Sequence, residues 1–289
     1  QVVREDADSL YDADCVFFEN RLFRGWGRER QDEKAFELLE ALKQRVGRVF
    51  WVDTTDGTGT TQFQLLPYVD GYFKTQILAD KLAYTRSYYS GRIYFDYYHS
   101  RFGVSDSNPL SVVPAEASEL SKIQLAWNDS LGDFGPWGRY MRRLDRYLPT
   151  PFFYSAKFAE PGKRPVNVSA RFGTVYASET VSFHRQMVQQ ALRALGVATD
   201  KIPKRKYLKE LRSAKLAVSP FGWGEPSYRD YDVIISGATL VKPDMSHLAT
   251  WPDLYVAGET YLPFNWDCSD LAEVLEDALE GDKWRRVAC

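Results

Sequence analysis

Short apolar runs alternate with amphipathic segments along the second half of the chain. Runs typical of strands occur at 166–170, 216–218, 238–241, 254–256 and 261–264. Between and after them, apolar residues recur at helical spacing in the segments 177–195, 204–214, 226–236 and 270–279. Gly196 is placed to end the first of these helices, and Ser269 is placed to cap the last. Strands that alternate with helices in this way predict a doubly wound α/β domain with a parallel sheet.

The first half begins with the same kind of pattern. An apolar run at 15–18 precedes a helical pattern whose apolar positions are Phe36, Leu39, Leu42 and Val46. Residues 48–53 then have the pattern of a buried strand. A strand, a helix and a strand in succession build parallel sheets with right-handed crossovers. The segment 68–98, rich in Tyr, Phe and Ile with scattered Gly and Lys, predicts strands and turns.

A cluster of helix and strand breakers marks the boundary between the two halves. Between Leu148 and Pro165 the breakers are Pro149, Pro151, Pro161, Gly162 and Pro165 itself. Neither a helix nor a central strand tolerates so many of them. We therefore expect two Rossmann-like domains, 1–150 and 151–289, each close to the usual domain size of roughly 100 to 150 residues.

Composition narrows the class of protein and of partner. The 289 residues include 39 acidic and 37 basic side chains, for a formal charge of −2, so no net field favours nucleic acid as a partner. Three cysteines without short spacing favour neither a disulfide framework nor a metal site, and we expect a cytoplasmic location with peripheral membrane association left open. No apolar run approaches the roughly 18 residues that span a bilayer. Because the first residue is Gln1, further domains of a longer chain are also left open.

Polar residues follow several of the predicted strands in the second half. Arg171 follows the first, the loop 219–225 the second, Lys242 the third, and Gly258 with Glu259 comes later. Ligands of open α/β sheets bind outside the carboxyl ends of the strands, so we expect these residues to line one crevice.

The segment from Ser219 to Ser236 carries the most chemical information. Gly222 and Gly224 allow tight backbone turns, and Pro226 suits the first position of a helix, whose free amides bind phosphate. Helical spacing places Glu225, Arg229, Asp232 and Ser236 on one face. The alternative interpretation is a solvated helix face with a Glu225 to Arg229 ion pair.

Residues 219–244 resemble the donor-binding segment of glycosyltransferases of the GT-B type, in which a Gly-rich loop leads into a helix bearing acidic residues. They are also similar to exostosin-like enzymes, whose Ser-x-Arg-x-x-acid pattern matches Ser227, Arg229 and Asp232. The resemblance covers most of the second half, whereas the first half matches only in its general plan. It implies GT-B architecture: two Rossmann-like domains with a cleft between them.

The resemblance also implies roles for individual residues. Gly222, Gly224 and Arg229 would hold the diphosphate of a nucleotide sugar, Asp232 the ribose hydroxyls, and Glu225 the donor sugar. Many members place seven residues between two glutamates, whereas six lie between Glu225 and Asp232 here, and Val233 stands at the expected position.

Two further cations and one histidine are also candidates for this site. Arg171 and Lys242 are diphosphate candidates because both follow predicted strands, and the alternative for each is a surface cation. His247 is a weaker candidate. His184 lies between Val181 and Val188 on the apolar face of its helix, which favours a hydrogen-bonded core histidine.

An inverting transfer needs a base, which we expect from the first domain. Asp56, with Asp53 as the alternative, lies in a loop after a predicted strand. A carboxylate can serve as the base if partial burial raises its pKa. The alternative interpretation is an Asp-Gly turn, and a transfer that retains configuration needs no such base.

Other motifs are absent or badly placed. Gly57-x-Gly59 and Gly222-x-Gly224 both lack the third glycine of a dinucleotide fingerprint, and the Asp-x-Asp pairs do not follow strands, so we expect no metal and no cofactor. With these motifs excluded, the resemblance implies a metal-independent hexosyl- or pentosyltransferase of polysaccharide biosynthesis that moves a sugar from a nucleotide diphosphate donor to a carbohydrate acceptor. The alternative is a non-catalytic glycan- or partner-binding module derived from such an enzyme, and an epimerase or phosphorylase of related fold is a weaker one.

Overall fold

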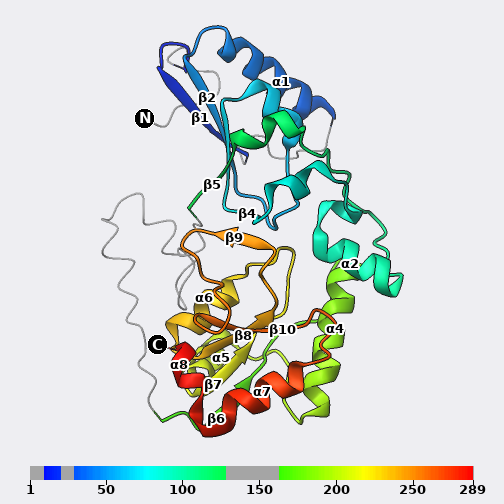
Figure 1. The fold of residues 1–289 in the computed structure, drawn as a ribbon, viewed down its shortest axis with the longest axis vertical. Coiled ribbons are helices and arrows are strands. Elements are labelled where there is room, and N and C mark those ends of the chain that lie inside the picture. Colours follow the sequence, from blue (N-terminus) through cyan, green and yellow to red (C-terminus); the bar gives the residue numbers. More distant parts are fainter. Residues whose placement is uncertain (1–9, 21–28, 128–162, 289) are drawn as a thin grey trace. The chain divides into compact units, whose positions relative to one another are not determined.

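The computed structural model describes residues 10–20, 29–127 and 163–288 (Figure 1). Contacts divide the chain into two compact units. The first unit comprises Gln1–Tyr97, Pro109–Asn128 and Leu248–Pro252, and the second comprises Tyr98–Asn108, Asp129–His247 and Asp253–Cys289. The predicted domain junction at 150–151 lies outside the described residues, and the boundary there stays a prediction.

The first unit contains a parallel sheet of four strands in the order β1-β2-β3-β5. The strands are β1 (Cys15–Glu19), β2 (Arg48–Asp53), β3 (Gly71–Lys74) and β5 (Ile123–Leu125), and helix α1 (Glu29–Lys43) connects the first two. Val16 pairs with Val49 and Asp53 pairs with Lys74 in the parallel registers. The predicted strands at 15–18 and 48–53 and the helix between them are therefore confirmed.

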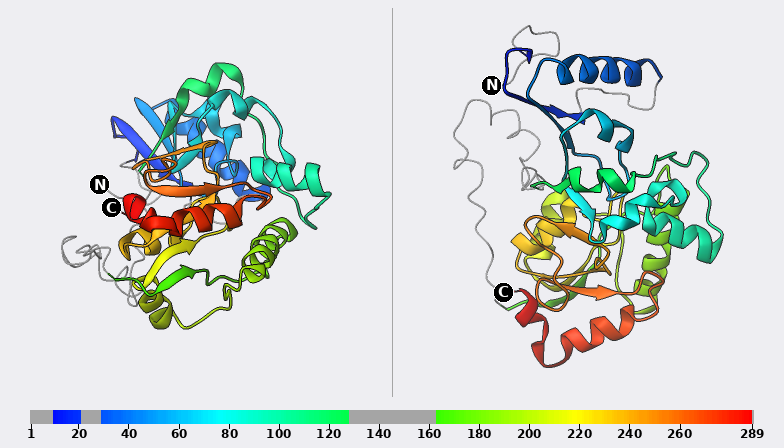
Figure 2. Two further views of the ribbon diagram at one scale, coloured as in Figure 1. Left: turned by 60° about the horizontal axis from the view of Figure 1, so that its bottom comes forward. Right: turned by 45° about the horizontal axis from the view of Figure 1, so that its top comes forward.

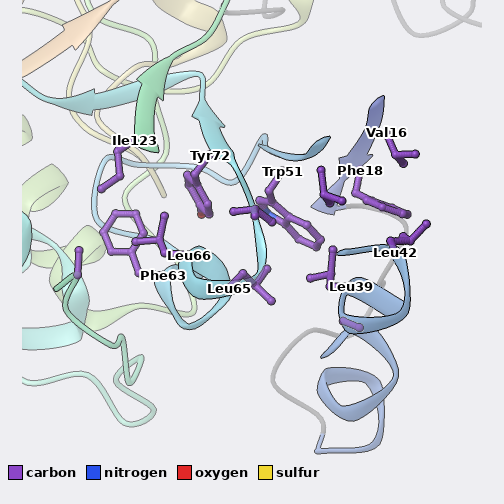
Figure 3. Packing of buried hydrophobic residues seen from close by; sticks show 14 of the residues in the cluster. Val16, Phe18, Leu39, Leu42, Trp51, Phe63, Leu65, Leu66, Tyr72 and Ile123 are labelled. Carbon is purple, nitrogen blue, oxygen red and sulfur yellow. The ribbon is translucent and has the colours of Figure 1, made fainter. Parts of the chain in front are cut away.

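The core of this unit forms where α1 and a 3₁₀ helix, Phe63–Tyr68, pack on the sheet. Figure 3 shows Leu39 and Leu42 of α1 facing Phe18 and Trp51, and Phe63 beside Tyr72. Trp51 is fully buried, and its indole Nε1 donates to Gln62 Oε1 at 2.8 Å. Burial of these aromatic and aliphatic side chains favours folding of the unit.

The segment 68–98 and its continuation are more varied than the predicted strands and turns. Strands β3 and β4 (Gln76–Leu78) are followed by 3₁₀ helices and then by helix α2 (Ile93–Phe102), which the sequence analysis missed. The 3₁₀ helices of the first unit are Phe63–Tyr68, Lys81–Thr85, Tyr89–Gly91 and Ala117–Lys122. Strand β4 pairs in antiparallel fashion with β9 (Leu248–Thr250), so a segment 170 residues further along the chain completes the first unit.

The second unit contains a parallel sheet in the order β10-β8-β7-β6. Its strands are β6 (Val166–Ser169), β7 (Ala214–Val218), β8 (Thr239–Pro243) and β10 (Tyr261–Phe264). Its helices are α4 (Glu179–Ala194), α5 (Lys204–Leu211), α6 (Tyr228–Ile235), α7 (Leu271–Leu279) and α8 (Trp284–Ala288), with a 3₁₀ turn at Glu280–Asp282. Two views of these elements are given in Figure 2.

Helices cover both faces of this sheet. Leu216, Val218 and Val241 belong to one core cluster with residues of α4, α7 and α8. Because side chains alternate along a strand, Ala217 and Lys242 point to the opposite face, where α5 and α6 pack on β7 and β8. The chain is thus a mixed α/β protein with parallel sheets, as predicted. Among the described strands the order is sequential, without the reversal of strand order that marks a switch point in doubly wound sheets.

Most elements of the second unit match the prediction, with four differences. Pro226 is not the first residue of a helix, because Ser227 caps α6 and the helix begins at Tyr228. The helix predicted at 204–214 ends at Leu211, because β7 already begins at Ala214. Residues 254–256 are not a strand, because the Val256 carbonyl accepts from the amides of Glu259 and Thr260 in a turn. Asp270, not Ser269, is the residue before the first turn of α7. Gly196 ends α4 with a φ of +73°, as expected.

Candidate functional site

The loop between β7 and α6 is held from the helix side by Asp230. The backbone amide and the hydroxyl of Ser227 both donate to the Asp230 carboxylate at 2.9 Å, and the two residues form the capping box that begins α6. The Tyr255 hydroxyl donates to the same carboxylate at 2.7 Å, and the Ser219 hydroxyl donates to it from the end of β7. Sequence reasoning missed Asp230, although the pattern Ser-x-x-Asp at 227–230 is the signal of such a cap.

Asp230 also neutralises Lys242 in the interior. Both side chains are fully buried, and the Lys242 ammonium lies 3.2 Å from the carboxylate. Burial lowers the pKa of Lys242, and the charge of Asp230 opposes that shift. Lys242 lies within β8 and makes its ion pair on the α6 side of the sheet, so it is neither the crevice-edge diphosphate ligand nor the surface cation that the sequence suggested.

His184 of α4 accepts a hydrogen bond from the same loop. The Phe221 amide donates to His184 Nε2 at 3.0 Å, so the ring proton is on Nδ1. Nδ1 then donates to the Tyr98 hydroxyl at 2.7 Å, and that hydroxyl donates to the Trp266 carbonyl at 2.6 Å. Burial lowers the pKa of His184 well below its usual value, with Arg185 and Lys242 acting in the same direction. The expectation of a hydrogen-bonded core histidine is confirmed.

Arg185, the next residue of α4, was not singled out from the sequence. Its Nε donates to the Phe221 carbonyl at 2.6 Å and its Nη1 to the Gly173 carbonyl at 3.0 Å. The guanidinium lies 4.6 Å from the centre of the Tyr176 ring. Arg185 therefore connects the loop after β6 with the loop after β7. The sequence gives no signal for this role, because both partners are backbone carbonyls of distant loops.

A pocket of about 310 Å³ opens where the loop after β6 meets α5 and α6. It is lined by Arg171, Phe172, Lys201, Ile202, Lys204, Tyr207, Arg229 and Asp232. Four of these side chains are cations and one is a carboxylate. Because positive charge exceeds negative charge in its lining, the pocket suits an anionic ligand.

Arg229 is one of the four cations of the lining. Its Nη2 donates to the Arg171 carbonyl at 2.8 Å, and its guanidinium lies 5.8 Å from the centre of the Phe172 ring. Its Nε is buried and has no hydrogen-bond partner among the described residues. The guanidinium is thus fixed in place and has N–H groups beyond the one bonded to Arg171, which is the property required of an anion ligand.

Tyr207 of α5 lines the same pocket. Its hydroxyl is buried and also makes no hydrogen bond of good geometry to a described residue. Burial raises the pKa of Tyr207, and the charge of Arg229 opposes the shift only in part. The phenol is therefore a neutral hydrogen-bond donor at physiological pH.

The other charged residues of the lining come from three different segments. Arg171 Nε donates to Glu210 at 3.0 Å, and the Lys204 ammonium lies 2.5 Å from Asp232, which is 7% exposed. Lys201 passes directly over Gly173, where a Cβ atom would lie 2.4 Å from its Cε. A side chain at position 173 would therefore displace Lys201 from the pocket.

The structure brings three of the predicted donor-binding residues together and leaves the others elsewhere. Arg171, Arg229 and Asp232 line the pocket, whereas Gly222, Gly224, Glu225 and Lys242 do not. The Gly222 amide donates to the Gly224 carbonyl at 3.0 Å, which is the tight turn expected from the two glycines. The sequence analysis missed Lys201, Lys204 and Tyr207. It selected residues that directly follow predicted strands, and these three do not.

Glu225 is fully buried before the start of α6, so it is not part of the predicted helical stripe. Its Oε1 lies 3.6 Å from His247 Nε2. The ring of His247 packs edge-on against Trp266, with centroids 5.1 Å apart. Contact with a donor sugar stays a prediction for Glu225.

The two candidates for a base lie in the first unit and differ from each other. Asp53 is fully buried, with Lys74 at 3.1 Å and the Thr55 amide donating to it at 2.8 Å. This carboxylate is occupied by the ion pair and by the loop amide, so it stabilises its loop. Asp56 is exposed, so the partial burial on which the argument for a base relied is not found there.

The described parts of the chain also bear on metal binding and on membrane insertion. Within them, no group of three or more His, Cys, Asp or Glu side chains is arranged to hold a metal ion. None of the described helices combines the length and the apolar character needed to cross a bilayer.

Comparisons with known proteins add little to this picture. No family model matches the chain, and no curated protein matches it. A solved structure described as "alpha-glucosyltransferase in complex with UDP-glucose and DNA containing an abasic site" is 11% identical, with 96% of this chain and 75% of that chain covered and a TM-score of 0.35. Likeness of this degree supports no conclusion about function. The functional proposal rests on the geometry of the pocket instead.

Proposed function

We propose that the second unit binds a nucleoside diphosphate sugar and that the chain is a metal-independent glycosyltransferase of the GT-B type with two Rossmann-like domains. The observation that carries this proposal is the cationic pocket, in which the predicted ligands Arg171, Arg229 and Asp232 lie together. Its volume of about 310 Å³ lies at the lower end of the roughly 300 to 1,000 Å³ typical of small-molecule sites.

The chemistry of the lining supports a diphosphate as the anchoring group. A guanidinium binds phosphate oxygens through two parallel hydrogen bonds, and Arg229 is already oriented by its bond to Arg171. Lys201 and Lys204 add charge that would stabilise a diphosphate leaving group without a metal ion. Asp232 would accept from the ribose hydroxyls once Lys204 turns toward phosphate. The acceptor in this proposal is a carbohydrate.

Nucleotide binding is the first test. The protein is titrated calorimetrically with UDP, GDP, dTDP, CDP and CMP, each in EDTA and in Mg²⁺, and its melting temperature is measured with each. A nucleotide at one hundred times its Kd adds about 2.7 kcal/mol to the free energy of unfolding. We expect one nucleoside diphosphate to stabilise the protein in EDTA and the effect to be lost in Arg229→Ala.

Two further variants make the test specific. Arg193→Ala removes a cation of the same unit that is 59% exposed and does not line the pocket, and it should bind the nucleotide as the wild type does. Arg229→Lys keeps the positive charge but lacks the two parallel N–H donors of the guanidinium, and it should bind the nucleotide with intermediate affinity. Wild-type affinity in Arg229→Ala, or no stabilisation by any nucleotide, would contradict the proposal and favour a binding module.

A further inference from the structure

The segment 201–212 concentrates positive charge in a chain that is slightly acidic overall. Its sequence, KIPKRKYLKELR, holds six cations and one acid, whereas the whole chain has a formal charge of −2. Lys201 and Lys204 line the pocket described above. The other four cations do not, and their position needs a separate explanation.

These four cations lie on the outer side of α5 and just after its end. Tyr207 and Leu211 are the buried positions of the helix, and they pack toward α6 and the sheet. Arg205, Lys206, Lys209 and Arg212 are all exposed. We call these four residues the α5 basic face, and eight helical residues give it a length of about 12 Å.

The charges of the α5 basic face are not neutralised within the described part of the unit. None of its four side chains has a carboxylate within the 4.0 Å of an ion pair among the described residues, and Glu210, the one acid of the segment, is bound to Arg171. The exposed cations near the end of the chain differ. Lys283 pairs with Asp277 at 2.5 Å, and Arg285 pairs with Asp282 at 3.4 Å.

The start of α5 makes this concentration of charge unfavourable for the helix itself. Its first turn contains no acidic residue, and Pro203 offers no side-chain cap. Cations at the amino end of a helix oppose the helix dipole, which favours anions there. An anionic partner outside the chain would remove both the repulsion among the cations and this conflict with the dipole.

We propose that the α5 basic face binds an acidic polysaccharide, a chain of sugar units that carry carboxylate or sulfate groups, and that this is the acceptor class. The assignment of acceptor rests on the proposed function. Lys201 and Lys204 connect the face with the pocket, so a polysaccharide held there would lie beside the donor.

The composition of the face favours this partner over two other polyanions. Helices that bind membrane surfaces pair a basic face with exposed apolar side chains, whereas no large apolar side chain of α5 is exposed. Proteins that bind single-stranded nucleic acid offer aromatic rings to the bases, and Tyr207, the one aromatic residue of 201–212, is buried. Duplex DNA presents one charge per roughly 1.7 Å, and a face of about 12 Å on an acidic protein neutralises little of it.

The test compares two triple variants with the same change of charge. Arg205→Gln/Lys206→Gln/Lys209→Gln removes three cations of the α5 basic face, and Lys283→Gln/Arg285→Gln/Arg286→Gln removes three exposed cations elsewhere in the unit. Binding to heparin, to polygalacturonate and to neutral dextran is measured at several salt concentrations. We expect about tenfold or greater loss of affinity for one acidic polysaccharide in the first variant, with a salt slope smaller by about two to three, and no binding of dextran.

Several outcomes of these measurements would overturn the proposal. Equal affinity of the first variant and the wild type would overturn it, as would tighter binding of duplex DNA or of phosphatidylserine vesicles than of either acidic polysaccharide at the same salt. An equal loss of polysaccharide binding in the control variant would show that net charge, and not the α5 basic face, causes the loss, and would also overturn the proposal. Nucleotide stabilisation is measured in parallel and should survive in the first variant, so failure of the polysaccharide arm is distinguishable from failure of the donor site.

Discussion

Each of the two units buries a lysine–aspartate pair, and the two pairs differ in what the lysine contacts. In the first unit Lys74 donates to Asp53, to Thr55 Oγ1 and to the Thr60 carbonyl at 2.9 to 3.1 Å, and Asp53 also accepts from Thr55 and Tyr72. In the second unit Asp230 accepts from Ser219, Ser227 and Tyr255, whereas Lys242 makes longer contacts of 3.2 to 3.4 Å to Asp230 and to the Ser219 carbonyl. Both aspartates therefore gather donors from their surroundings, and Lys74, unlike Lys242, also gathers loop oxygens at short distances.

This difference shows how a buried pair can serve a neighbouring loop. Lys74 gathers carbonyl and hydroxyl oxygens and so holds the loop after β2. Asp230 gathers hydroxyl and amide donors and so holds the loop that leads into α6 and Arg229. In each unit the lysine and the aspartate also offset the cost of burying each other's charge.

The largest effect is expected when the aspartate of the second pair is removed. Asp230→Ala leaves the Lys242 ammonium buried without its counter-charge, which should lower the free energy of unfolding by about 3 to 5 kcal/mol. Urea unfolding measures the change. A loss below about 1 kcal/mol, the usual net value of a single hydrogen bond, would mean that the pair does not hold the loop.

Matched substitutions of the two lysines sharpen the comparison. Lys74→Met takes the ammonium donor from the oxygens of Thr55 and Thr60, whereas Lys242→Met takes it from the Ser219 carbonyl, and both aspartates keep their hydroxyl and amide donors. We expect Lys74→Met to cost about 1 to 3 kcal/mol more than Lys242→Met, the cost of buried oxygens left unsatisfied. Equal losses in parallel urea titrations would show that both pairs act only through their charges.

A smaller difference should appear in acid, because the second pair has a titratable neighbour. Burial lowers the pKa of His184, so below about pH 6.5 the unfolded state takes up a proton that the folded state does not. Stability should therefore fall as the pH decreases, by up to about 1.4 kcal/mol per pH unit from this group. The free energy of unfolding is measured from pH 7 to 5 for the wild type and for His184→Gln, which should lack this part of the slope; identical slopes would contradict the assignment.

The sequence predicts the pairs and the pocket unequally. Asp53 is visible as the end of a strand, but its partner Lys74 follows only from the register of β2 on β3. Arg171, Arg229 and Asp232 are found from strand ends and helical spacing, because both are local patterns. Lys201 and Lys204 reach the pocket through the packing of α5 on α6, which is tertiary. Helix α2 was missed because its sequence, IYFDYYHSRF, is rich in residues that favour strands.

The pairing of β4 with β9 has a consequence for synthesis of the chain. Leu78 of β4 pairs with Leu248, 170 residues later. At about 5 to 20 residues per second, β4 leaves the ribosome roughly 10 to 30 seconds before its partner strand does. During that interval the nascent first unit presents an open strand edge, which is a template for pairing with other chains. Translation rate and chaperone access should therefore influence the yield of this protein more than its equilibrium stability would suggest.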